Sequence, residues 1–355
     1  MSDEATILPA KPSRRAPADR RPASVTVVDV ARLAGVSAIT VSRALNTPEQ
    51  VSPGTLERVR EAVRQTGYVP NLLAGGLRSN KSRLVAAVVP TIAGPVFMET
   101  IQALTEALAE KGYQLILGQS GYTDSREDAL LDALIGRRPD GIVLTGILHS
   151  PQGRRRLIAS GIPVVETWDL SDDPIDMLVG FSHEEIGAAV CRFLHGRGRR
   201  RPVLLSGDDA RARRRNAGFV KAARELGMDW DAHHGVPTRL VPAPTTLASG
   251  RSGTSALLQA HPGFDAVFCS SDLLALGVLT EAQARGLAVP RDFAVMGFGD
   301  QHYAAALHPA LTTVRIDGNA MGRTAARFIV ERAEGRAVEE RIVDIGFSMV
   351  ERDSA

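Results

Sequence analysis

Arg43 and several short polar side chains are spaced along residues 26–46 in a way that suits contact with a polyanion. Gly35 permits a tight left-handed exit from one short helix, and Ser37 can cap a second helix that is predicted to run through Leu45. Two helices joined in this way are typical of a helix-turn-helix, whose second helix enters the major groove of DNA. The residues predicted to face outward there and reach base edges are Ala38, Ile39 and Arg43.

The chemistry of these side chains separates the reading of bases from the positioning of the helix. Arg43 can donate two hydrogen bonds to guanine, worth about 1–3 kcal/mol of discrimination, whereas Ala38 and Ile39 offer only apolar contact, for instance with thymine methyl groups. Short hydroxyl and amide groups suit phosphate oxygens, which fix register rather than sequence. A plain three-helix bundle has similar turns, so spacing alone leaves both interpretations open. The residues predicted to contact phosphate are Thr26, Ser37, Thr40, Ser42 and Asn46.

Motifs for catalysis or metal binding do not occur in this sequence. It contains no G-x-S-x-G, no phosphate-binding P-loop and no histidine spacing suited to a metal; His233 and His234 are adjacent, which prevents both from sharing one helix face. Cys191 and Cys269 each lie in an apolar stretch and are predicted to be reduced core thiols. We therefore expect no enzyme, no metal and no cofactor.

The N-terminal part of the chain must hold the groups that contact the polyanion. Residues 1–23 are rich in proline and lack apolar periodicity, which predicts a disordered arm. Residues 24–70 contain three short helix patterns, the first with Val30, Leu33 and Ala34 toward a core. This segment is predicted to be an all-α helix-turn-helix headpiece.

Beyond a linker at residues 71–82, apolar strands alternate with amphipathic helices over residues 83–355. Such alternation indicates parallel sheets covered on both faces, and six or more units favour an α/β core of two doubly wound lobes. Ligands of such sheets bind at the carboxyl ends of strands. The predicted strands are Leu84–Val89, Gln114–Leu117, Gly141–Leu144, Pro163–Glu166, Pro202–Leu205, Ala266–Cys269 and Ala294–Gly297. The predicted helices include Met98–Lys111, Glu184–Gly196, Ala217–Leu226, Asp272–Arg285 and Met321–Glu334.

Charge is distributed unevenly along the chain. Residues 1–82 carry 12 Lys and Arg against 7 Asp and Glu, whereas the remainder carries 30 against 33. This excess points to a polyanionic partner for the N-terminal part alone. No apolar run approaches the length of a membrane helix, and the first 24 residues are not signal-like, so a cytoplasmic protein without a membrane partner is expected.

Several motifs together resemble the lactose repressor family of transcriptional regulators. The headpiece is similar in V-T-V-V-D-V-A-R-L-A-G-V-S-A-I-T-V-S-R-A-L-N, V-S-P-G-T-L-E-R-V-R-E-A and G-Y-V-P-N. The core is similar in L-V-A-A-V-V-P-T, P-D-G-I-V-L-T, G-I-P-V-V, F-C-S-S-D-L-L-A-L-G and V-M-G-F-G-D, so the resemblance covers residues 25–347. Within the family, N-T-P-E-Q-V-S, L-T-x-x-x-H-S-P and D-M-L-V-G-F resemble the gluconate repressor branch.

The resemblance implies a hinge helix that folds on operator DNA and inserts a leucine into the minor groove. Leu77 occupies that wedge position, and unstacking a base step costs a few kcal/mol that bent-DNA contacts can offset. Gly75 and Gly76 each disfavour a helix by about 1 kcal/mol relative to alanine. The hinge is therefore expected to be mostly unfolded away from DNA; the alternative is a flexible linker with a buried leucine.

The resemblance also implies an effector pocket between two lobes like those of periplasmic sugar-binding proteins. Arg215 matches the family position whose cation holds the polar head of the effector, and Phe97 can pack against sugar carbons. Gly299 stands where many relatives have an aspartate, which suits an acidic effector because like charges repel. Arg211, Arg213 and Arg214 are interpreted as a solvated basic face. The candidate effector-binding residues are Phe97, His149, Glu166, Asp169, Arg215, Ser271 and Asp272.

The resemblance thus implies a repressor that binds pseudo-palindromic, double-stranded operator DNA at the nucleoid. A homodimer is expected because paired half-sites require two headpieces, and the chain ends without room for the leucine-heptad tail of tetrameric relatives. The effector is predicted to be a sugar acid of the gluconate or keto-gluconate type, acting through linkage between the two sites. The alternatives are the same regulator responding to a neutral sugar and, more remotely, a solute-binding protein.

Overall fold

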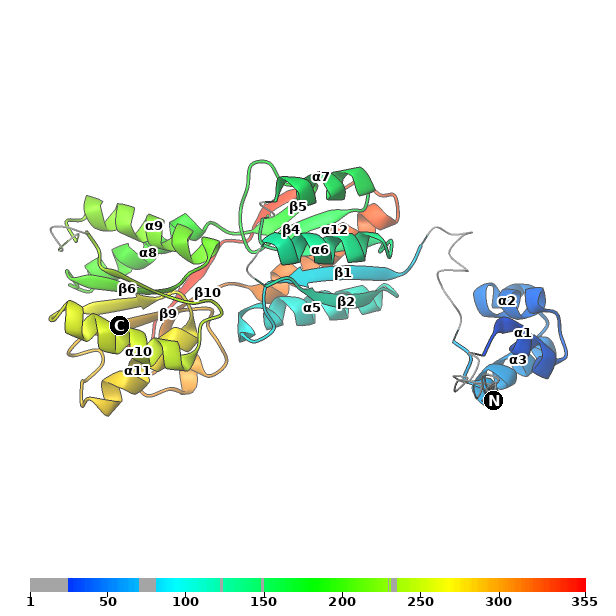
Figure 1. Ribbon diagram of the computed structural model, residues 1–355, viewed down its shortest axis with the longest axis horizontal. Helices are drawn as coiled ribbons and strands as arrows, with labels where there is room; N and C mark the ends of the chain where they lie inside the picture. The colour runs from blue at the N-terminus through cyan, green and yellow to red at the C-terminus, as the bar shows by residue number, and fades with distance from the viewer. Residues whose placement is uncertain (1–24, 70–80, 122–123, 148–149, 229, 231–234) are drawn as a thin grey trace, which may run out of the picture. The chain divides into compact units, whose positions relative to one another are not determined.

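The computed structural model describes residues 25–69, 81–121, 124–147, 150–228, 230 and 235–355. The chain divides into two compact units, Met1–Asn80 and Lys81–Ala355 (Figure 1). None of the helices within the described ranges has the length and hydrophobicity that a membrane crossing requires.

The first unit is a small helical bundle. It contains α1 (Val27–Ala34), α2 (Ala38–Asn46), the 3₁₀ turn η1 (Pro48–Gln50) and α3 (Pro53–Thr66). Gly35 has a φ of 64°, which glycine adopts without strain, and this sharp turn sends α2 away from α1. The buried face of α1 consists of Val30, Ala31 and Ala34, so the prediction for Val30 and Ala34 is confirmed. The prediction for Leu33 was wrong: it lies beside that face and is 52% exposed.

The second unit consists of two α/β lobes. In the first lobe, six parallel strands lie in the order β2-β1-β3-β4-β5-β11, with α5 and α12 on one face and α6 and α7 on the other (Figure 1). The strands are β1 (Leu84–Val89), β2 (Gln114–Gln119), β3 (Gly141–Thr145), β4 (Val164–Thr167), β5 (Met177–Gly180) and β11 (Ile342–Asp344). The helices are α5 (Met98–Glu110), preceded by the 3₁₀ turn η2 (Pro95–Phe97), α6 (Asp124–Ile135), α7 (Pro151–Ser160) and α12 (Gly318–Ala333).

The second lobe repeats this design. Its strand order is β7-β6-β8-β9-β10-β12, in which β12 alone runs antiparallel to its neighbour. The strands are β6 (Pro202–Gly207), β7 (Thr238–Val241), β8 (Ala266–Cys269), β9 (Ala294–Phe298), β10 (Thr312–Arg315) and β12 (Ser348–Val350). The helices are α8 (His183–Gly196), α9 (Ala210–Glu225), α10 (Leu247–Ala260) and α11 (Asp272–Ala284), with the 3₁₀ turn η3 (Ala304–Ala306). α8 and α9 pack together on one face of this sheet, and α10 and α11 pack together on the other (Figure 1).

The predicted fold class, two doubly wound lobes and an all-α headpiece, is confirmed. All seven predicted strands occur, although the core also contains β5, β7, β10, β11 and β12. The structure also contains α6, α7 and α10, which are not among the predicted helices. Among the predicted helices the largest difference lies in α9, which begins at Ala210 rather than Ala217 because the Asp209 carboxylate caps it by accepting from the Ala212 N–H (3.0 Å). Both cysteines are buried free thiols, as predicted.

The chain passes between the lobes three times: from β5 to α8, from β10 to α12, and from β11 to β12. Two of these crossings are joined by a hydrogen bond from the Ile345 N–H to the Gly180 carbonyl (2.9 Å). The lobes are therefore connected by three passages of the chain (Figure 1).

α8 and α9 approach each other closely through two glycines. A Cβ on Gly187 would lie 1.9 Å from the Arg215 carbonyl oxygen, and a Cβ on Gly218 would lie 2.0 Å from the Glu184 carbonyl oxygen. Glycine is therefore required at both positions for the two backbones to touch. This contact fixes the part of α9 that carries Arg215 directly against the first turns of α8.

Candidate functional site

The exposed face of α2 carries most of the residues predicted to contact DNA bases. Ile39 is 72% exposed, and Ser42, Arg43 and Asn46 are exposed at positions three, four and seven residues further on, which share a face with it. Within the described residues, no hydrogen bond or ion pair engages the Arg43 side chain, so its guanidinium can donate to a base. Ala38 is half-buried and packs against the headpiece core.

The hydroxyl groups near the ends of these helices already have local partners. The Thr26 hydroxyl donates to the Asp29 carboxylate (2.7 Å), which also accepts from the Thr26 N–H (3.0 Å); these bonds lower the pKa of Asp29. The Ser37 hydroxyl accepts from the Thr40 N–H (3.1 Å) and lies 2.8 Å from the Thr40 hydroxyl. These side chains therefore order the helix starts as N-caps do. Leu77 and His149 lie outside the described residues.

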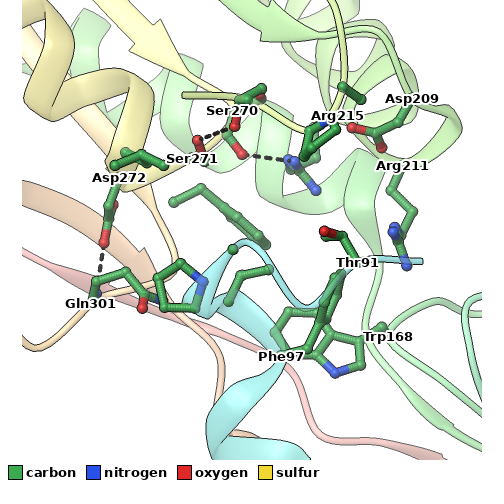
Figure 2. Close-up of a pocket in the computed structure, with 18 of the residues that line it drawn as sticks. Thr91, Phe97, Trp168, Asp209, Arg211, Arg215, Ser270, Ser271, Asp272 and Gln301 are labelled. Atoms are coloured by element: carbon green, nitrogen blue, oxygen red, sulfur yellow. Dashed lines mark hydrogen bonds between the residues drawn. The ribbon is translucent and has the colours of Figure 1, made fainter. Parts of the chain in front are cut away.

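A cleft of about 750 Å³, including space open to solvent, lies between the two lobes at the carboxyl ends of their strands. Figure 2 shows the Arg211 and Arg215 side chains above the rings of Phe97 and Trp168. The cleft thus combines cations, aromatic rings and hydroxyl-bearing or carboxylate side chains, which are the groups that hold sugars and their acids. Its polar lining includes Thr245, Ser270, Ser271, Asp272 and Gln301.

Arg215 is a buried cation in the wall of this cleft. Its side chain is 5% exposed; Nη2 donates to the Ser270 carbonyl (3.0 Å), and the guanidinium carbon lies 3.9 Å from the centroid of the Phe298 ring. Burial lowers the pKa of Arg215 to about 10, so the group stays charged at neutral pH. Its Nε is buried without a hydrogen-bond partner, and no carboxylate forms an ion pair with it in the part of the chain that the structure describes.

His183, the first residue of α8, lies directly behind Arg215. It is 2% exposed, its Nδ1 lies 2.9 Å from Arg215 Nη1, and its Nε2 lies 2.9 Å from the Trp168 carbonyl oxygen. Burial first, and then the positive charges of Arg215 and Arg211, hold the pKa of His183 well below its usual range. The imidazole is therefore neutral at physiological pH.

Asp272 marks the other end of the cleft. Its carboxylate is fully buried at the start of α11, where it accepts from the Thr313 hydroxyl (2.6 Å) and the Gln301 N–H (2.7 Å). Burial raises the pKa of Asp272 to about 6, although these two bonds oppose the shift. The neighbouring Ser271 caps α11 by accepting from the Leu274 N–H (3.3 Å), and its hydroxyl lies 3.0 Å from that of Thr245.

Two arginines of α9 contact the first lobe. Arg211 donates to the Thr145 carbonyl (3.1 Å) and lies over the Phe97 ring at 5.0 Å, while Arg214 pairs with Asp169 (2.8 Å). The interpretation of both as a solvated basic face was therefore wrong, because each has a partner across the cleft. Arg213 alone fits that interpretation, since its side chain is 63% exposed and pairs with Asp208.

The structure brings together four of the residues predicted to bind the effector: Phe97, Arg215, Ser271 and Asp272. Asp169 lies at the edge, in a depression that adjoins the cleft and shares Asp209 and Arg211 with it. Glu166 does not line the cleft: it is fully buried in β4, where its carboxylate accepts from the Ile175 N–H (2.8 Å), so its selection was wrong.

Sequence reasoning missed several side chains that line the cleft. His183 lies two residues after the apolar run M-L-V-G-F, so a strand prediction for β5 would have placed it near a strand end. Gln301 lies in a loop, and no pattern in the sequence marks it. Among the described residues, no group of three His, Cys, Asp or Glu side chains is arranged to hold a metal ion.

Comparison with known proteins gives matches over nearly the whole chain. Residues 26–71 match the model of bacterial regulatory proteins of the lacI family, and residues 191–355 match a periplasmic binding protein-like domain. The HTH-type transcriptional regulator GntR of Pseudomonas aeruginosa is 36% identical over 330 residues, which are 93% of this chain and 95% of that protein.

Solved structures agree with these matches. A transcriptional regulator of the same family from Silicibacter pomeroyi is 31% identical, with a TM-score of 0.86 over 93% of this chain and 99% of that one. The lac repressor dimer, solved bound to operator and an anti-inducer, is 25% identical, with a TM-score of 0.77 over 93% of this chain and 98% of that one.

Proposed function

The chain belongs to the lacI family of bacterial regulatory proteins, and from this premise we propose that a sugar acid of the gluconate or keto-gluconate type controls its binding to operator DNA. It is a DNA-binding transcriptional regulator, and the relatives named above are regulators rather than enzymes. The proposal adds the chemistry of the effector, the residues that hold it and the role of repressor.

The observation that supports an acidic effector is the state of Arg215. A guanidinium that is 5% exposed, borders the cleft and lacks a carboxylate partner among the described residues carries a buried charge that a ligand carboxylate would neutralise. His183 is neutral and does not supply a negative charge. Asp209 and Asp169 act on this charge from a distance, but a neutral sugar would leave it without a direct ion pair to the described residues.

The remaining lining suits the polyhydroxyl part of such a ligand. With its carboxylate at Arg215, a six-carbon chain would lie against Phe97 and Trp168, and its hydroxyl groups would reach Ser271 and Asp272 at the other end. This end of the cleft carries a hydroxyl donor and a carboxylate acceptor, which are complementary to sugar hydroxyls.

For the DNA we propose that residues 24–70 form the binding headpiece, with Ile39, Arg43 and the nearby Ala38 reading bases in the major groove. Residues 71–82 would form the hinge, with Leu77 in the minor groove, in a homodimer that reads a pseudo-palindromic operator at the nucleoid. The phosphate contacts proposed are those of Thr26, Ser37, Thr40, Ser42 and Asn46.

Calorimetric titration of the full-length protein tests the effector. We expect D-gluconate or 2-ketogluconate to bind, and sorbitol and glucose, which lack the carboxylate, to bind far more weakly. Arg215→Met should abolish binding of the acid, whereas Arg224→Met, an exposed arginine in the last turn of the same helix, should not. Binding of neutral sugars alone would refute the acidic effector.

Selection of genomic DNA fragments by the purified protein tests the regulatory part. The proposal requires a defined set of bound fragments whose affinity changes when the sugar acid is added, because effector and operator affinities are linked. An identical set with identical affinities in both conditions would contradict it.

A further inference from the structure

His183 lies where the chain passes from the first lobe to the second, at the first residue of α8. It is buried, and both ring nitrogens are engaged by groups from different lobes: the Trp168 carbonyl after β4, and the Arg215 guanidinium in α9. One imidazole therefore connects an aromatic residue of one cleft wall with the cation of the other.

The partners of His183 fix its tautomer. A backbone carbonyl only accepts hydrogen bonds, and a guanidinium only donates them. Nε2 must therefore carry the proton and donate to Trp168, while Nδ1 accepts from Arg215 Nη1. The ring can satisfy both partners in this one neutral form.

This arrangement restricts the guanidinium on several sides. Nη1 is held by His183, Nη2 by the Ser270 carbonyl, and the face of the group by the Phe298 ring. Trp168 is in turn held by its indole N–H, which donates to the Thr100 hydroxyl (3.2 Å), and by edge contact with the Phe97 ring at 5.0 Å. A hydrogen-bonded path thus runs from Arg215 through His183 to the backbone of Trp168.

We propose that His183 is a positioning residue with two separable roles: its Nδ1 orients Arg215 toward the carboxylate of the effector, and its Nε2 transmits occupancy of the cleft from the second lobe to the first. The first role rests on the proposed function, since it assumes an acidic ligand. The second requires only that a ligand contacts Arg215.

Two substitutions separate the roles, because each amide imitates one ring nitrogen. His183→Asn keeps an acceptor near the Nδ1 position and loses the reach to Trp168. His183→Gln keeps a donor near the Nε2 position and loses the acceptor for Arg215. His195→Asn, in the last turn of the same helix, is the matched control.

The full-length variants are compared by titration with D-gluconate and by the ratio of the dissociation constants for a selected DNA fragment with and without this acid. His183→Gln should weaken gluconate by about tenfold or more, the order expected for a hydrogen bond to a charged group, and should keep the ratio at saturation. His183→Asn should keep the affinity for gluconate and bring the ratio toward one. The proposal would be overturned if both variants lost the affinity for gluconate together with the effect of gluconate on DNA binding. It would also be overturned if neither variant lost either property.

A ligand-free measurement keeps the inference separate from the identity of the effector. Long-range ¹⁵N–¹H spectra of the wild-type protein at pH 7, with the His183 signals assigned by their absence in His183→Asn, should show Nε2 protonated and Nδ1 unprotonated. The opposite tautomer, or a doubly protonated ring, would refute the positioning role. A wild-type protein with this tautomer that binds no sugar acid would refute the proposed function alone.

Discussion

Replacement of Asp272 by asparagine should make the protein more stable at neutral pH and leave it nearly unchanged in acid. The carboxylate is fully buried, and burial raises its pKa from 3.8 to about 6. This difference corresponds to about 3 kcal/mol between the two protonation states.

The sign follows from proton linkage. A pKa that is higher in the folded state means that the folded protein binds the proton more tightly, so the contribution of Asp272 to stability is fully present below pH 3.8 and is lost as the pH rises to about 6. Above that range the wild type retains a buried carboxylate that opposes folding. Asparagine removes this titration but can still accept from the Gln301 N–H and donate to the Thr313 hydroxyl.

The assay is urea unfolding of wild type and Asp272→Asn from pH 4 to pH 8. The variant should gain stability relative to wild type between pH 4 and 6, by up to about 3 kcal/mol, and the difference should level off above that range. Asp208→Asn, at an exposed carboxylate, controls for the lost charge. A difference that is independent of pH, or that grows as the pH falls, would refute this account of Asp272.

Three further predictions concern other parts of the molecule. Gly187→Ala should lower the free energy of unfolding by about 1–3 kcal/mol or more, because the new methyl group would meet the Arg215 carbonyl. Gly196→Ala, with open space around the new methyl group, should not lower it. Equal urea midpoints for the two variants would contradict this prediction. Hydrogen bonds from Arg285, Ser255 and Arg251 lower the pKa of Glu281 to about 2. Glu281→Gln should therefore destabilise the protein above pH 4.5, and by progressively less as the pH falls from 4.5 toward 2. A loss of unfolding free energy that stays constant over this pH range would argue against the prediction. Ser37→Ala removes the cap of α2 and should lower the unfolding free energy of the headpiece by about 1 kcal/mol. Calorimetry of the full chain should show this as a lower melting temperature of the headpiece. An unchanged transition would show that the cap is not needed.

The sequence carries a strong signal for the buried strands and a weak one for the edges of the sheets. Central strands such as β1 and β8 are continuous apolar runs with turns on both sides, which is why both were predicted with the bounds that the structure shows. β7, β11 and β12 are short and partly exposed, and their sequences do not differ from loops. Tertiary pairing rather than local preference makes them strands.

In the candidate site, too, the sequence carries a strong signal for some residues and a weak one for others. Arg215 and Asp272 lie in motifs that mark the family, so resemblance located them. The arginine run that precedes Arg215 reads as surface, because a sequence does not show that Asp169 and the Thr145 carbonyl face it from the other lobe. Glu166 fails for the opposite reason: it alternates with cleft residues along a strand end, yet its side chain turns into its own lobe to hold the Ile175 N–H.

The three passages between the lobes restrict how the second unit can rearrange. Two bodies tied by three passages of chain, two of them hydrogen-bonded to each other, are expected to pivot against one another, whereas sliding or separation would stretch the backbone at every tie. A small molecule that touches only one body and does not contact Arg215 would bind without altering the pivot angle. Fragments of the effector that fill half the cleft without contacting Arg215 are therefore expected to act as silent competitors, and only a compound that reaches Arg215 or both walls should change the affinity for DNA.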